Sequence, residues 1–229
     1  MKILKILALS LAPAAMALPA AATPVSVELE FDGLTAWRSV DFGPTPVTPY
    51  FDPAAAGGLR MSDTTGTLED FVAWCLDIAA PLGTSNSHDY DAGDSLTTLT
   101  QAALGRIQSL FDSSYGGVDV SNSDQSAGFQ MALWDALYDD DYDIGSGIFQ
   151  VSATGSNNAN GFAGSYLNAA AGYAGPQAFD LTFLESTGSP HKQNLVTADP
   201  VAPVPLPAAA WLLGLALGGL GLAGTRRRG

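Results

Sequence analysis

An uncharged apolar run near the C-terminus limits which part of this chain can fold in water. It extends from Leu206 to Ala223, 18 residues without an acidic or basic side chain, and Arg226, Arg227 and Arg228 follow it. As a helix it would reach about 27 Å, close to the thickness of a hydrocarbon core. Arginines directly after such a run hold that end in the cytoplasm. We therefore predict a transmembrane helix at 206–224, a basic cytoplasmic tail at 225–229, and everything upstream outside the cytoplasm.

The N-terminus has the features of a secretory signal peptide. Lys2 and Lys5 precede an apolar stretch from Ile6 to Ala17, and small residues follow at Ala20–Ala22. This order of a basic, an apolar and a small-residue segment predicts a signal peptide at 1–22, cleaved after Ala22. Residues 23–198 are then enough for one extracytoplasmic domain with its own core, and the proline-rich residues 199–205 form a stiff linker.

The junction between linker and apolar run carries a short proline motif. It reads Val204-Pro205-Leu206-Pro207-Ala208. With the apolar run and the arginines, it resembles the VPLPA-CTERM variant of the PEP-CTERM sorting signals of Gram-negative bacteria. The resemblance implies recognition by an exosortase, a membrane cysteine transpeptidase-like enzyme. It also implies anchoring in the inner membrane before processing, then a place at the cell surface or in an extracellular matrix with exopolysaccharide. A plain single-span membrane anchor is the alternative.

Removal of both ends makes the remaining chain strongly acidic. Of nine Lys and Arg, only Arg38, Arg60, Arg106 and Lys192 lie between the two signals, against 23 acidic residues. The net charge of this part is therefore about −19, which repels phosphate backbones and excludes nucleic acid as a partner. Such a surface suits solubility outside the cell or the binding of divalent cations.

One cysteine, Cys75, occurs in the chain. An exported domain with a single cysteine has no intrachain disulfide, so its stability depends on its core, a metal or another crosslink. A lone thiol in an oxidising compartment is a liability unless it is buried or used.

The hydrophobic pattern predicts an α+β domain, with strands towards the ends of the chain and helices in its middle. We expect strands at 25–31, 71–78, 148–152, 179–184 and 194–197, and helices at 96–111, 123–138 and 158–174. The Gly-, Pro- and Thr-rich residues 33–60 are expected to form a loop with at most one short edge strand, and residues 83–95 a polar loop. In the strand at 71–78, alternation places Val72, Trp74, Leu76 and Ile78 on the core face and Cys75 on a mixed face.

Two segments in this pattern stand 55 residues apart. The first is Trp74-Cys75-Leu76-Asp77, and the second is Phe129-Gln130-Met131-Ala132-Leu133-Trp134. Together they resemble the signature segments of the thioester domains of bacterial surface adhesins. The resemblance covers roughly residues 70–150 and implies that Cys75 is the thiol and Gln130 the acyl donor of an internal thioester. The segment departs from that family at Asp77, where a more neutral residue is typical.

The chemistry of such a bond sets requirements on its surroundings. A thiolate attacks the glutamine carboxamide, ammonia leaves, and the acyl thioester survives only where water is excluded until a nucleophile arrives. Trp74, Phe129 and Trp134 are the side chains that we expect to shield it. The alternative is that Cys75 is a small buried hydrophobe and that Gln130 bonds to loop backbone.

Other sites have weaker support in the sequence. Asp139, Asp141 and Asp143 resemble a calcium loop, but the glycine stands at the seventh position and Gln150 occupies the twelfth. Asp89, Asp91 and Asp94 form a second acidic group. His88 and His191 are isolated, which disfavours zinc, and neither a G-x-S-x-G nor a phosphate-binding motif occurs.

These observations favour a non-enzymatic, exported surface or matrix protein. We expect it to be an adhesin, with an internal Cys75–Gln130 thioester that captures an amine-bearing partner at a surface or in exopolysaccharide. The alternative is a carbohydrate- or calcium-binding extracellular module without covalent chemistry. No cofactor is expected apart from calcium.

Overall fold

The computed structural model describes residues 24–202. The predicted signal peptide, the sorting motif from Val204 to Ala208, the apolar run and the three arginines therefore lie outside the described residues. Among residues 24–202 no helix has the length and apolar character needed to cross a bilayer.

The strands of the described part are joined only by antiparallel pairs. They are β1 (Val25–Phe42), β2 (Ala54–Asp63), β3 (Phe71–Cys75), β4 (His88–Gly93), β5 (Val151–Ala153), β6 (Phe179–Ser186) and β7 (Leu195–Pro200). The pairings run β1–β2–β3–β7–β6–β4 and return to β1, so the sheet closes on itself. Closure leaves these strands without a free edge, and β5 pairs with the far end of β1.

The length of β1 makes this closure possible. Val25–Leu29 pairs with β4, and the strand then runs on from Leu29 to Val40 along β2. The register with β2 shifts twice, once between Phe31 and Gly33, and Gly33 has a φ of 121°. That backbone angle favours glycine, and such bulges bend a strand and increase its twist. One continuous strand therefore turns from one partner to the other.

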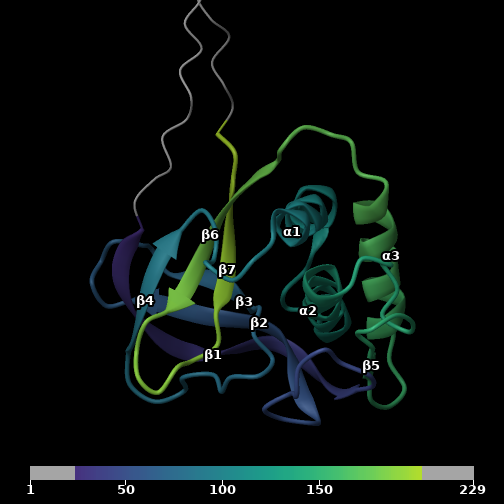
Figure 1. Ribbon diagram of the computed structural model, residues 1–229, viewed down its shortest axis with the longest axis horizontal. Coiled ribbons are helices and arrows are strands. Elements are labelled where there is room, and N and C mark those ends of the chain that lie inside the picture. Colours follow the sequence, from purple (N-terminus) through teal and green to yellow (C-terminus); the bar gives the residue numbers. More distant parts are fainter. Residues whose placement is uncertain (1–23, 203–229) are drawn as a thin grey trace, which may run out of the picture.

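Three helices pack on one side of this closed sheet (Figure 1). They are α1 (Gln101–Ser114), α2 (Ser123–Tyr138) and α3 (Ala159–Ala171). Residues from Ser126 to Ala136 of α2 are all buried, because this helix contacts β1 and β2 as well as both other helices. Asn122 caps α2, its side chain accepting from the N–H groups of Asp124 and Gln125.

The prediction of an α+β domain is correct for the described residues, and the helix at 123–138 has the bounds that we expected. The loop prediction for residues 33–60 is wrong, because β1 extends to Phe42 and β2 begins at Ala54. The loop prediction for 83–95 is also wrong, since it contains β4 between β1 and β6. The strand from Phe71 ends at Cys75, earlier than expected.

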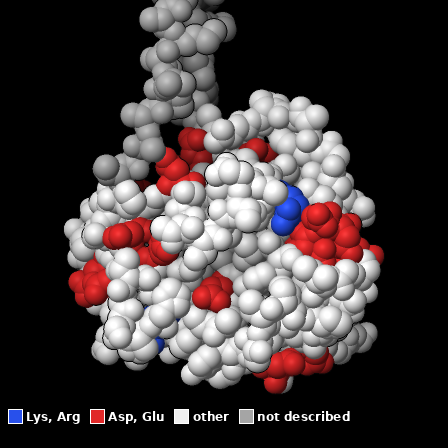
Figure 2. Space-filling view, in the orientation of Figure 1, with Lys and Arg blue, Asp and Glu red and all other residues white. Residues whose placement is uncertain are grey.

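The surface of the described part is mostly uncharged or acidic. Figure 2 shows Asp and Glu in several separate groups on one face, with few basic side chains. One basic residue, Arg38, forms an ion pair with Asp124 of α2 at 2.7 Å. On this face the acidic side chains are therefore spread over several places rather than gathered in one patch.

Candidate functional site: Cys75 and Gln130

The structure brings Cys75 and Gln130 together at the end of β3. The carboxamide of Gln130 forms two hydrogen bonds with the backbone of Cys75. Cys75 N–H donates to Gln130 Oε1 at 2.9 Å, and Gln130 Nε2 donates to Cys75 C=O at 2.8 Å. Gln130 is fully buried and Cys75 nearly so. The two segments separated by 55 residues thus meet through a buried contact of two bonds.

The place of this contact follows from the end of a strand pair. The last residues of β2 and β3 that pair are Leu59 and Ala73. Beyond that point Cys75 pairs only with Leu195 of β7. The planar carboxamide of Gln130 supplies one acceptor and one donor to the backbone of Cys75, as a neighbouring strand would. It therefore satisfies a buried N–H and a buried C=O that would otherwise be unpaired.

A second side chain of α2 holds the segment that follows. The hydroxyl of Tyr138 donates to Leu76 C=O at 3.1 Å and accepts from Ile78 N–H at 3.3 Å. Gln130 and Tyr138 lie two turns apart on the same face of the helix. The helix therefore fixes the chain from Cys75 to Ile78 at two points.

Replacing Tyr138 by Phe tests how much the contact of its hydroxyl with the backbone of Leu76 and Ile78 contributes. We expect the free energy of unfolding in urea to fall by about 2 kcal/mol, since both hydrogen bonds of the hydroxyl, to Leu76 C=O and from Ile78 N–H, are lost. Because both bonds of Gln130 remain, the chemistry at Cys75 is expected to be unchanged. Tyr142→Phe is the matched control, as no partner of the Tyr142 hydroxyl is found among residues 24–202. A loss of stability in Tyr142→Phe equal to that in Tyr138→Phe would contradict the assignment.

The thiol of Cys75 points to another glutamine. Cys75 Sγ donates to Gln193 Oε1 at 2.8 Å. Gln193 is held by its backbone, since its N–H donates to Pro81 C=O and its C=O accepts from the hydroxyl of Tyr90. Burial, with a smaller contribution from the carboxylate of Asp77, raises the pKa of the Cys75 thiol to about 12. The thiol is therefore protonated at neutral pH.

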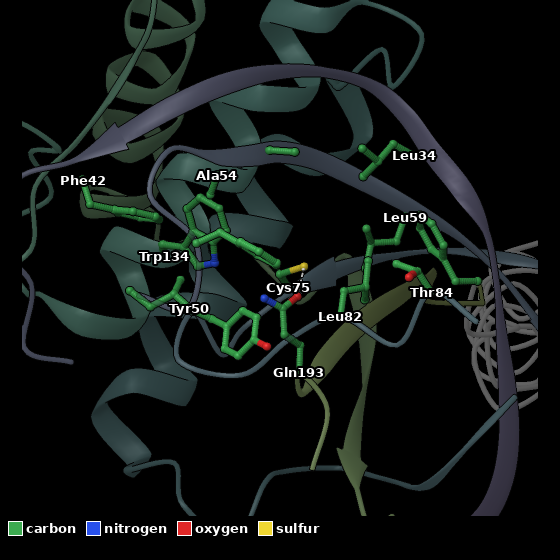
Figure 3. Close-up of a pocket in the computed structure, with 14 residues that line it drawn as sticks. Leu34, Phe42, Tyr50, Ala54, Leu59, Cys75, Leu82, Thr84, Trp134 and Gln193 are labelled. Atoms are coloured by element: carbon green, nitrogen blue, oxygen red, sulfur yellow. Dashed lines mark hydrogen bonds between the residues drawn. The ribbon is translucent and has the colours of Figure 1, made fainter. Parts of the chain in front are cut away.

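A cavity of about 260 Å³ lies against this thiol. Figure 3 shows Cys75 and Gln193 at one side of it and Trp134 at another. Its walls are mainly apolar: Phe31, Leu34, Phe42, Leu59, Ile78 and Leu82. Tyr50 and Phe51, from the loop between β1 and β2, also line it and are 53% and 62% exposed. The face of the β3 segment that carries Cys75, which we expected to be mixed, is thus buried and lines an apolar cavity.

The three residues expected to shield the site occupy two different places. Trp74 and Phe129 are fully buried and pack edge to face, with ring centroids 4.7 Å apart, in an aromatic cluster with Phe111 and Tyr115. Trp134 instead lines the cavity and packs on Phe42. All three are buried, and of the three only Trp134 lines the cavity, so their role as a shield stays a prediction.

Sequence reasoning missed Gln193, Tyr50 and Phe51. All three lie in loops, which carry no hydrophobic period that would place a side chain. The adjacent aromatics Tyr50 and Phe51 in a proline-rich stretch were the one available signal, because large apolar side chains exposed together often mark a binding site.

The acidic loop after α2 does not gather into a metal centre. Among the described residues no group of three or more His, Cys, Asp or Glu side chains is placed to hold an ion. Asp139 instead accepts from the N–H groups of Ile148 and Phe149, and Asp141 accepts from the Ser146 hydroxyl. Asp143 accepts from Gly145 N–H. Calcium binding by Asp139, Asp141 and Asp143 remains a prediction.

One carboxylate near this loop is unusual. Asp135 of α2 is fully buried, and neither of its oxygens has a hydrogen-bond partner in the described part of the chain. Burial raises its pKa to about 7, and the charges of Asp141, Asp139 and Asp143 add to that effect while Arg106 opposes it.

No protein-family model matches the chain, and no curated protein is found as a relative. The similar solved structures include two that are each 12% identical in sequence. The first is the N-terminal domain of the Streptococcus pyogenes pilus tip adhesin Cpa, with a TM-score of 0.44 over 74% of this chain and 96% of that one. The second is the N-terminal thioester domain of the fibronectin-binding protein SfbI from Streptococcus pyogenes, with a TM-score of 0.37 over 75% and 96%. The function proposed below rests on the contacts of Cys75 and Gln130.

Proposed function

We propose that this chain is an exported adhesin whose domain forms an internal thioester between Cys75 and Gln130. One observation carries the proposal. The buried carboxamide of Gln130 is held on both of its polar atoms by the backbone of the only cysteine in the sequence. This contact joins the proposed acyl donor to the backbone of the residue that carries the thiol, and both residues are buried.

The hydrogen bonds suit the formation of the bond. Attack of Cys75 Sγ on Gln130 Cδ puts negative charge on Oε1, which already accepts from Cys75 N–H at 2.9 Å. A backbone donor aimed at the developing oxyanion lowers the barrier to acyl transfer. The S–C bond then forms, the C–N bond breaks, and the thiol proton leaves with Nε2 as ammonia. Because the reactants and products are all neutral, the reaction leaves no charge in the buried site.

The raised pKa of Cys75 keeps the unbonded thiol protonated and therefore weakly reactive. A protonated, buried thiol is a poor nucleophile, so proximity to Gln130 is what favours this one reaction over oxidation by solutes. Asp77, where the adhesin domains have a more neutral residue, contributes to the raised pKa. We expect bond formation to be slow and to occur once in each molecule.

The bond is proposed to serve covalent attachment. An amine of a partner attacks Gln130 Cδ, an amide forms, and Cys75 leaves as a thiol that regains its proton. The partner is a surface or exopolysaccharide molecule that bears an amine. The sorting signal motivates the proposal of exosortase delivery, by way of an inner-membrane intermediate, to the cell surface or matrix.

Alkylation of the folded protein tests the proposed bond. We expect iodoacetamide not to alkylate the folded wild-type chain, since its one thiol is acylated. Methylamine is expected to open the thioester and release a free Cys75. Its addition would raise the mass by about 31 Da, the mass of the whole reagent.

Two controls make the alkylation result specific. In Gln130→Ala no acyl donor remains, so Cys75 is expected to be a thiol before any methylamine is added. After unfolding in urea, Cys75 of this variant alkylates fully, whereas Cys75 of the wild type does not. Equal alkylation of the two unfolded chains would show an ordinary free thiol and leave a non-covalent carbohydrate- or calcium-binding module as the function.

A further inference from the structure

Apart from the Cys75 thiol and the Tyr50 hydroxyl, which are both ordinarily neutral at pH 7, the cavity beside Cys75 carries no ionisable side chain. Its lining contains no Asp, Glu, Lys, Arg or His, although the chain has 23 acidic residues. A cationic group would find no carboxylate in it, and an anionic group would be repelled by the acidic domain. The part of a ligand that enters this cavity is therefore uncharged.

Two of the residues that line the cavity, Trp134 and Gln193, have a donor group without an acceptor in the described part of the chain. Trp134 is 2% exposed and its Nε1–H has no hydrogen-bond partner among residues 24–202. An indole N–H can only donate, and a buried donor without an acceptor is costly. Gln193 Oε1 is occupied by the Cys75 thiol, while no acceptor for Gln193 Nε2 is found in the described residues. Both groups are suited to a carbonyl or hydroxyl oxygen of a ligand.

The mouth of the cavity is aromatic. Tyr50 and Phe51 are largely exposed, and their rings meet edge to face with centroids 4.7 Å apart. Exposed aromatic rings beside an apolar pocket mark a binding groove. A pyranose ring presents a face of C–H groups that packs on such rings, with its hydroxyl groups still in water.

We propose that this cavity binds an N-acetylated sugar residue. The acetyl methyl packs against the apolar walls, the acetyl carbonyl accepts from Trp134 Nε1–H, and the sugar ring lies on Tyr50 and Phe51. The inference deepens the proposed function, on which its biological role rests, by naming the chemistry of the partner.

Titration of the indole N–H signals tests the proposal. The chain has four tryptophans, and Trp134→Phe assigns the signal of interest in a ¹H–¹⁵N spectrum of the 229-residue chain in lipid nanodiscs. Di-N-acetylchitobiose is expected to move the Trp134 signal downfield, since its N–H gains an acceptor. Cellobiose, which has the same ring skeleton without the acetamido groups, and the cationic glucosamine dimer are expected to leave that signal in place.

Two variants measure what each contact contributes. Trp134→Phe loses no hydrogen bond within the described residues and is expected to raise the half-saturating concentration of di-N-acetylchitobiose about tenfold, measured by calorimetry because this variant has no Trp134 signal. Tyr50→Ala changes an exposed side chain, so the fold is expected to remain while binding weakens. A Trp134 signal that stays fixed up to the solubility limit of the sugar would overturn the proposal. So would equal shifts with cellobiose, or a shift of the exposed Trp37 alone.

Cys75→Ala separates this proposal from the thioester. The variant has no thiol, but Trp134 and the aromatic mouth remain, so it is expected to bind the acetylated sugar. Binding by Cys75→Ala together with an alkylatable wild-type thiol would retain the sugar site and reject the thioester. A thioester in the wild type, together with a Trp134 signal that the sugar does not move, would retain the thioester and reject the sugar site.

Discussion

Gln130→Ala is expected to destabilise this domain strongly. It leaves the N–H and the C=O of Cys75 buried without partners, each at a cost of about 1–3 kcal/mol, and it opens a cavity in the helix interface. We therefore expect the free energy of unfolding in urea to fall by about 3–5 kcal/mol. If the thioester is present, Nε2 has already left as ammonia, so the substitution removes the remaining bond from Cys75 N–H and also the crosslink between residues 55 apart.

Two further variants separate these contributions. Cys75→Ala removes any crosslink but keeps both hydrogen bonds of Gln130, so its loss of stability is expected to be the smaller one. Gln101→Ala, at an exposed position at the start of α1, is the matched control and is expected to change stability by less than about 0.5 kcal/mol. A Gln130→Ala variant as stable as Gln101→Ala would contradict the role given to the carboxamide.

Asp135→Asn is expected to stabilise the protein above pH 7 and to lose that advantage in acid. The pKa of Asp135 is about 7 in the folded protein and near 4 in the unfolded chain, so the unfolded state releases this proton first as the pH rises. As the pH rises from about 4 to about 7, the ionisation of Asp135 therefore lowers the stability of the wild type. Above that range it has the full penalty of a buried, unpartnered carboxylate.

The size of the effect follows from two opposing costs. A shift of this extent corresponds to at most about 4 kcal/mol, and the unpaired amide of Asn offsets about half of it. We expect the melting temperature of Asp135→Asn to exceed that of the wild type by about 5 °C at pH 8, and to lie below it by about the same amount near pH 4, where only the cost of the amide remains. Asp140→Asn, an exposed neighbour, serves as control. A constant difference between Asp135→Asn and the wild type across pH 4–8 would show that Asp135 does not titrate in this range.

How far the sequence predicts this structure depends on whether each signal is local. The helix at 123–138 was predicted with its bounds because its cap at Asn122 and its apolar residues are close in sequence. β4 was missed because His88–Gly93 is mostly polar, and its strand conformation comes from pairing with β1 and β6. The long β1 was missed because Gly33, read as a loop residue, is a bulge within a strand.

The candidate site likewise has one part that local sequence signals predict and one part that depends on long-range contacts. Cys75 and Gln130 were paired through the resemblance of two short segments, and the structure places the Gln130 side chain on the Cys75 backbone. The partner of the thiol was not predicted, since Gln193 reaches Cys75 from a loop 118 residues away in sequence. Contacts of that range are set by the closed sheet and leave no periodic pattern in the chain.

The mass of the Cys75–Gln130 linkage tests the central claim most directly. The wild-type chain is digested under acidic conditions without amines, and the peptides that contain residues 75 and 130 are identified by mass spectrometry. We predict one linked species, lighter than the sum of the two peptides by about 17 Da, the mass of the ammonia that leaves. The species should be absent from Cys75→Ala and Gln130→Ala. Two separate peptides of unaltered mass from the freshly folded wild-type protein would contradict the account.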